Sequence, residues 1–165
     1  MSPPEPFFFN ETSDPAKLNN RQRGHLAEVA FMRKAASLGL PIAKPWNEGE
    51  RYDFIARVHN ICWRVQVKSV SKKSALKNHY RIKTSGGRAR HTPYSATEID
   101  FLVAYIHPED IWYVFPASFI AGREAVCVFP GSKRSVYEQY REAWKLMNPI
   151  PTETAAQHKE QTAGT

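Results

Sequence analysis

The sequence predicts an α+β domain in which helices flank a mixed central β-sheet. The chain opens with a helical segment whose apolar residues recur every three or four positions. A series of short strand-like runs follows, and a second helical segment comes after them. This order is typical of α/β or α+β domains rather than of all-helical or all-β folds.

The first helix is expected over residues 14–38. Asp14 followed by Pro15 is a helix-start signal, and Gly39 is a typical residue just beyond a helix end. The Asn19–Asn20 pair marks a point where this segment can divide in two. The apolar or small residues that carry this helical spacing are Ala27, Ala30, Phe31, Ala35 and Leu38.

Seven strands and a last helix complete the predicted domain. The strands are expected at 41–46, 52–58, 61–70, 80–84, 101–107, 111–115 and 125–129. The last helix is expected over residues 135–147, because an apolar stripe recurs there at helical spacing. We interpret this stripe as core packing; it comprises Val136, Tyr140, Ala143, Trp144 and Met147.

Composition indicates one folded domain of 165 residues, with 42% hydrophobic and 12% aromatic residues. We expect an N-terminal arm at 1–13, a globular domain at 14–148 and a polar, disordered tail at 149–165. No apolar run approaches the roughly 18 residues of a membrane span, and the first residues lack the pattern of a secretory signal. A soluble, cytoplasmic protein is therefore expected.

Cysteine and histidine give no sign of a zinc site. Cys62 and Cys127 form no CxxC pair, and both are expected to be small side chains in or near the core. The six histidines show no HxxxH or HExxH spacing.

A hairpin at residues 51–68 brings polar side chains together. His59 and Asn60 separate two alternating segments and predict a tight turn. With a two-residue turn there, paired positions add up to 119, so Asp53 lies opposite Gln66. Lys68 is on the same face, two residues further along.

The alternation of side chains supports this register independently. One face can pack and carries Tyr52, Phe54, Ala56, Val58, Ile61, Trp63, Val65 and Val67. The other is mostly polar and carries Arg51, Asp53, Ile55, Arg57, Cys62, Arg64, Gln66 and Lys68. Exposure to solvent alone would also explain such a polar face, so the hairpin by itself leaves the existence of a site open.

Together with Glu28 on the first helix, these residues resemble the PD-(D/E)XK nuclease superfamily. The segments that carry the resemblance are GHLAE, ending at Glu28, YD, ending at Asp53, and QVK at 66–68. The resemblance covers residues 20–116 and implies a restriction-endonuclease-like core. It is greatest for a small branch that contains intron-encoded homing endonucleases and archaeal-type Holliday-junction resolvases.

The resemblance implies an endonuclease that hydrolyses DNA phosphodiester bonds with Mg²⁺, or Mn²⁺ in its place. Its catalytic residues would be Glu28, Asp53, Gln66 and Lys68. Asp53 would bind the metal directly, the carbonyl of Gln66 or of the Val67 backbone would add a ligand, and Glu28 would act through water. Lys68 would orient the attacking water and stabilise charge. Gln66 departs from the usual acidic residue, which implies weaker metal binding.

Positive charge is concentrated just after this motif. The chain has a net charge of +7, and residues 68–90 carry eight Lys and Arg and no acidic residue. His91 follows directly. The residues expected to contact DNA are Lys72, Lys73, Lys77, Tyr80, Arg81, Lys83, Arg88 and Arg90.

Three functions remain open at this point. The first is the endonuclease, acting as a homodimer or homotetramer on duplex or branched DNA, because so small a domain covers few base pairs. The second is a nucleic-acid-binding module that keeps the nuclease fold without catalysis. The third is a protein-interaction role for the aromatic segment at 111–119.

Overall fold

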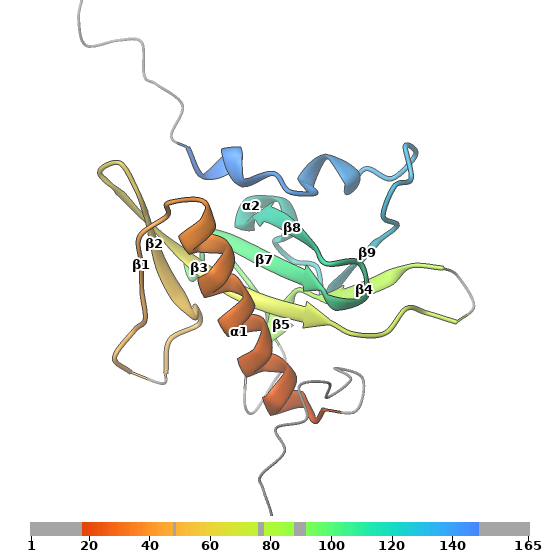
Figure 1. Cartoon of the computed structure of the whole chain (residues 1–165), viewed down its shortest axis with the longest axis horizontal. Helices are drawn as coiled ribbons and strands as arrows, with labels where there is room; N and C mark the ends of the chain where they lie inside the picture. Colours follow the sequence, from red (N-terminus) through yellow and green to blue (C-terminus); the bar gives the residue numbers. More distant parts are fainter. Residues whose placement is uncertain (1–17, 48, 76–77, 88–91, 149–165) are drawn as a thin grey trace, which may run out of the picture.

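A computed structural model describes residues 18–47, 49–75, 78–87 and 92–148. Their centre is a five-stranded sheet in the order β1-β2-β3-β7-β8 (Figure 1). Its strands are β1 (Ile42–Ala43), β2 (Phe54–Val58), β3 (Ile61–Val70), β7 (Phe101–Ile106) and β8 (Ile111–Pro116). β3 and β7 run parallel and the other neighbours antiparallel, so the mixed sheet is confirmed. The predicted arm and tail, 1–13 and 149–165, lie outside the described residues.

Four further strands form two small sheets beside the central one. β4 (Tyr80–Lys83) pairs with β9 (Ala125–Val128), and β5 (Ser85–Gly86) pairs with β6 (Thr92–Pro93). A one-turn helix, α2 (Ala117–Ile120), follows β8. Among the described residues, no helix is both long enough and apolar enough to cross a membrane.

The long helix α1 (Asn20–Ser37) lies across one face of the sheet (Figure 1). Its buried residues Ala27 and Phe31 pack on the sheet, with the Phe31 ring 4.9 Å from that of Phe54. Removing a buried ring of this kind costs about 3–5 kcal/mol. The helix therefore owes its position to the apolar spacing seen in the sequence.

The start of α1 differs from the prediction. Asn19 is the N-cap: its side chain accepts a hydrogen bond from the Gln22 N–H, and the Gln22 side chain accepts one from the Asn19 N–H. This reciprocal cap begins the helix at Asn20, so a helix running unbroken through residues 18 and 19 is wrong. The predicted start at 14–17 lies outside the described residues. Gly39 follows the helix with φ 64°, as expected for its C-terminal end.

The predicted hairpin register is confirmed along β2, from Phe54 to Val58. Phe54 pairs with Val65 and Val58 with Ile61, and each pair adds up to 119. Phe54 and Val65 are buried beneath α1 as expected, but Tyr52 precedes β2 and packs in the core on the other side of the sheet. Cys62 is exposed, so the near-core prediction is wrong for it; Cys127 is partly buried.

The predicted helix at 135–147 is wrong. The chain instead forms two short 3₁₀ turns, Glu138–Tyr140 and Trp144–Met147, and Val136 is 64% exposed. Between the turns, the Glu142 N–H donates to the Trp112 carbonyl (2.8 Å), and its carboxylate accepts from the Trp112 N–H (2.9 Å). These bonds satisfy the edge of β8, and they hold Glu142 at φ 47°, where a helix cannot continue.

Candidate active site

A cleft of about 700 Å³ opens where α1, the start of β2 and the middle of β3 come together. Glu28, Asp53, Gln66 and Lys68 all line it, together with the Val67 backbone. The structure therefore brings the four side chains singled out from the sequence into one cleft. Three of them come from the hairpin and one from the helix that covers it.

Asp53 lines the cleft, and its carboxylate is largely buried and hydrogen-bonded to β3. Its N–H donates to the Val65 carbonyl (2.9 Å), which is already the partner of Phe54, so the pairing is one residue out of step at Asp53. Its Oδ2 accepts hydrogen bonds from the Val67 N–H (2.8 Å) and from Gln66 Nε2 (2.5 Å). The carboxylate is thus held by the opposite strand.

The pKa of the Asp53 carboxyl is raised from 3.8 to about 6, mainly by burial and also by the nearby Glu28. The Val67 N–H, Lys68 and Lys44 act in the opposite direction. Loss of solvation outweighs these favourable contacts. The charged form of this carboxyl lacks full solvation, and a cation that enters the cleft would stabilise it.

The Gln66 side chain is only 8% exposed and points into the same corner. Its amide nitrogen donates to Asp53 Oδ2 and to the Val67 carbonyl oxygen (3.0 Å). Turning the amide around would set its oxygen against these two acceptors, so the nitrogen position is the one the network requires. The two oxygens expected to bind metal therefore hold a hydrogen-bond donor between them.

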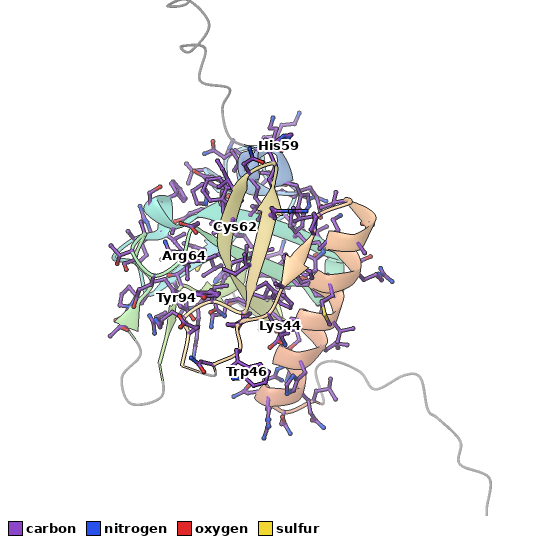
Figure 2. The ribbon with its side chains drawn as sticks, turned by 90° about the vertical axis from the view of Figure 1, so that its left-hand side faces the viewer. Lys44, Trp46, His59, Cys62, Arg64 and Tyr94 are labelled. Atoms are coloured by element: carbon purple, nitrogen blue, oxygen red, sulfur yellow. The ribbon has the colours of Figure 1, made fainter. Side chains whose placement is uncertain are left out.

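Glu28 faces the cleft from α1 and is paired with Lys44. The Lys44 ammonium lies 2.6 Å from Glu28 Oε2 and 5.3 Å from the Phe54 ring centre. Figure 2 shows Lys44 on the connection between β1 and β2, beside α1. Sequence reasoning missed this lysine, because the contact joins residues 16 apart and no local pattern signals it.

Lys68 is placed by an aromatic ring that the sequence analysis also missed. Its ammonium lies 5.2 Å from the centre of the Tyr94 ring, and the Arg51 guanidinium lies 4.5 Å from the same ring. Tyr94 is 4% exposed, so the ring is fixed by its surroundings. A Cβ atom at Gly86 would overlap the Tyr94 hydroxyl, which explains why a glycine stands there.

Part of the predicted DNA-contacting set rims the cleft. Lys72, Arg81 and Lys83 line it, and the exposed residues of β4 alternate with buried ones as a surface strand should. Arg23 of α1 adds a further positive charge that the sequence analysis did not single out. The rim is basic on both sides.

Other members of that set are placed differently. Tyr80 is 2% exposed and its hydroxyl donates to Glu109 (2.9 Å), so its ring is not available to a duplex. Lys73 pairs with the same Glu109 (3.3 Å). The remaining members, Lys77, Arg88 and Arg90, lie outside the described residues.

A family model for PD-(D/E)XK endonucleases matches residues 18–147. This chain belongs to the PD-(D/E)XK endonuclease family. The match spans the helix, the hairpin and the later strands, and so extends past the 20–116 segment that carried the resemblance.

A solved structure agrees with this membership in the PD-(D/E)XK family. The chain is similar to a bacterial homing endonuclease, I-Ssp6803I, with a TM-score of 0.69 and 30% sequence identity. The similarity covers 78% of this chain and 93% of that one. The comparison with curated protein sequences found no match.

The donor set of this PD-(D/E)XK site suits a hard cation that keeps some of its waters. Within the described residues, no three His, Cys, Asp or Glu side chains gather as a metal cluster. The available oxygens are the Asp53 carboxylate, the Val67 carbonyl and, after rotation of its amide, Gln66, and Glu28 lines the same cleft. Oxygen ligands of this kind fit Mg²⁺ and Mn²⁺ and do not fit a thiolate or imidazole metal.

Proposed function

We propose that this family member is a Mg²⁺-dependent endodeoxyribonuclease that cuts duplex DNA in the cleft between α1 and the β2–β3 hairpin. The observation that carries the proposal is the meeting of Asp53, Gln66 and Lys68 with Glu28 in one cleft whose rim is basic. Mn²⁺ is expected to replace Mg²⁺.

The chemistry follows from the residue types. Asp53, the Val67 carbonyl and a rotated Gln66 would hold the cation, which supplies charge neutralisation and a more acidic water. Lys68, held against Tyr94, would orient the attacking water and balance the negative charge that develops on the phosphate. Water would form a bond to phosphorus and lose a proton to solvent while one P–O bond breaks, and the leaving oxygen would take up a proton from solvent.

The basic rim would position the duplex. Lys72, Arg81 and Lys83 can contact phosphates on one side of the cleft and Arg23 on the other. We further propose that the protein acts as a homodimer or homotetramer, since one small domain contacts few base pairs. Sedimentation of the purified protein with and without duplex tests this part.

The test of the enzyme is plasmid cleavage with Mg²⁺ or Mn²⁺. Wild type should cut, and Asp53→Ala and Lys68→Ala should lose cutting while they keep DNA binding. Lys133→Ala, which removes an exposed lysine outside the cleft, is the matched control for loss of a charge. A branched substrate run beside the linear duplex shows which form is preferred.

A second candidate is a DNA-binding module without catalysis. It is favoured by one observation, the amide at position 66, which brings no negative charge and in this structure presents nitrogen rather than oxygen. Salt-sensitive DNA binding by all variants, with no cutting under either metal, would establish this alternative. The interaction role for segment 111–119 has no support, because β8 is buried along nearly its whole length.

A further inference from the structure

Trp46 is the most exposed large apolar side chain of the described residues, at 99% exposure. It lies on the connection between β1 and β2, next to Lys44 (Figure 2). An indole presents on the order of 200 Å² of largely apolar surface, so leaving it in water forgoes one of the largest hydrophobic gains any residue offers. Burial of this indole against another molecule would therefore be favourable.

The connection that carries Trp46 is tied to the cleft at both ends. On one side Lys44 pairs with Glu28 at 2.6 Å. On the other, Arg51 donates to the Gly86 carbonyl at 2.6 Å and pairs with Glu98 at 3.2 Å. Glu28 and Gly86 both line the cleft, so the exposed indole is held beside it.

Distance along the chain limits how far Trp46 can lie from the chemistry. Two peptide units separate it from Lys44, so their Cα atoms are at most about 7.6 Å apart. A B-DNA duplex has a major groove about 12 Å wide and a minor groove about 6 Å wide. Since Lys44 contacts Glu28, and Glu28 lines the cleft, Trp46 stands beside the cleft that a bound duplex would enter.

We propose that Trp46 inserts into a groove of the bound duplex and packs against bases next to the cut, a contact that rests on the proposed endonuclease function. The charges around it favour bases over phosphates. Lys44 is already paired with Glu28, and Glu50 on the same connection is acidic, so this segment offers a phosphate no net attraction. In this arrangement Trp46 would contact bases, and the basic residues that line the cleft would contact phosphates.

The other exposed apolar residues do not share this setting. Leu26 and Val29 of α1 lie in a depression shared with Tyr105 and Trp112 of the sheet. None of these four residues lines the cleft. Trp46, by contrast, is almost fully exposed on a segment whose Lys44 pairs with the cleft residue Glu28.

The test measures binding of a fluorescently labelled duplex without metal, so that no cutting interferes, over a range of salt concentrations. Trp46→Ala should weaken binding about 5- to 100-fold, the range for loss of one base-stacking aromatic. The slope of log affinity against log salt should stay at its wild-type value. Lys83→Ala, the comparison for a phosphate contact, should lower that slope by about one. Trp46→Phe should keep most of the affinity.

Acrylamide quenching of tryptophan fluorescence gives an independent measurement. Duplex should protect a fluorescence component that Trp46→Phe lacks. Protection that appears on raising the protein concentration without DNA would assign the indole to a second copy of the chain and overturn the proposal. Because Trp46 touches almost nothing, both variants should melt like wild type.

The outcomes separate this inference from the one it rests on. A wild-type protein that cuts DNA, with Trp46→Ala binding as tightly as wild type, would overturn the groove contact alone. A wild-type protein without affinity for DNA would overturn the endonuclease proposal and this contact together.

Discussion

The amide nitrogen of Gln66 lies 2.5 Å from Asp53 Oδ2 and 3.0 Å from the Val67 carbonyl oxygen. A hydrogen-bond donor thus sits between two oxygens that would otherwise face each other in a buried corner. In the metal-free protein the amide partly compensates the desolvated carboxylate of Asp53. A cation that binds these oxygens has to displace that nitrogen first.

Gln66→Glu should separate the two roles of this position. Without metal at pH 8, a second carboxylate beside Asp53 loses the hydrogen bond and adds repulsion, so the variant should be about 1–3 kcal/mol less stable than wild type. With Mg²⁺ or Mn²⁺ it should be stabilised more than wild type, and each tenfold gain in affinity adds about 1.4 kcal/mol at saturating metal. Thermal melts with and without metal measure both effects.

The matched control is the double variant Asp53→Asn, Gln66→Glu. With only one carboxylate of the pair left, it should lose both the metal-free penalty and the enhanced response to metal. If Gln66→Glu alone melts like wild type in the absence of metal, the amide does not hold Asp53 in solution.

Asp53→Asn should stabilise the protein at neutral pH. The pKa of Asp53 is about 6 in the folded state against 3.8 for the free group, so above pH 6 the carboxylate is ionised in both states but is less well solvated in the folded one. Two pKa units correspond to about 3 kcal/mol at most. As pH falls from 6 to 4, wild type takes up a proton in the folded state and gains this stability.

The asparagine variant has no such titration and can still accept hydrogen bonds from Val67 and Gln66. The two stability curves should therefore converge below about pH 4 and differ most at pH 8. Denaturant melts at a series of pH values without metal measure this. An Asn variant less stable than wild type at pH 8 contradicts the raised pKa.

The hairpin could be predicted because its alternation leaves only one register that buries the apolar face. A slip of one residue would have turned Phe54 and Val65 away from α1 and placed the polar side chains of the other face in the apolar core beneath it. Once the register is set along β2, Asp53, the residue just before it, falls close enough to Gln66 for their side chains to form a hydrogen bond. This part of the site could therefore be predicted from residues that lie close together in the sequence.

The rest of the site depends on contacts between distant segments. Nothing near Lys44 signals its pairing with Glu28, and nothing near Tyr94 signals that its ring lies against Lys68. The failed helix at 135–147 has the same origin, since bonds between Glu142 and the edge of β8 outweigh a helical apolar pattern. The predicted DNA contact of Tyr80 is wrong because its hydroxyl donates a hydrogen bond to Glu109 and its ring is buried in the core.

Tyr94 is expected to act as a positioning residue for Lys68. In Tyr94→Leu the ammonium loses the ring it lies against, and kcat should fall about 3- to 30-fold, the worth of one partly buried cation–π contact. Tyr94→Phe keeps the ring and should restore most of the rate. Gly86→Ala should resemble Tyr94→Leu, because its Cβ displaces the tyrosine.

DNA binding without metal distinguishes positioning from general damage in these variants. Tyr94→Leu should bind a duplex about as tightly as wild type while cutting it more slowly. Equal losses in Tyr94→Phe and Tyr94→Leu would show that the hydroxyl, rather than the ring, carries the effect.

Lys44 is expected to set the acid limit of metal binding. Its charge lowers the pKa of Asp53, and removing it in Lys44→Met should raise that pKa further above its free value. A protonated Asp53 cannot bind a cation, so the pH below which Mn²⁺ affinity falls should move upward in the variant. Calorimetric titration of Mn²⁺ between pH 5 and 8, with Lys133→Met as the control, measures this displacement of the pH limit.

The salt dependence of the displacement tests its electrostatic origin. The Lys44 side chain is 54% exposed, so its field is screened by salt, and the displacement of the pH limit should shrink as ionic strength rises. A displacement that persists unchanged at 1 M salt would indicate that Lys44 acts through the position of Glu28 rather than through its charge.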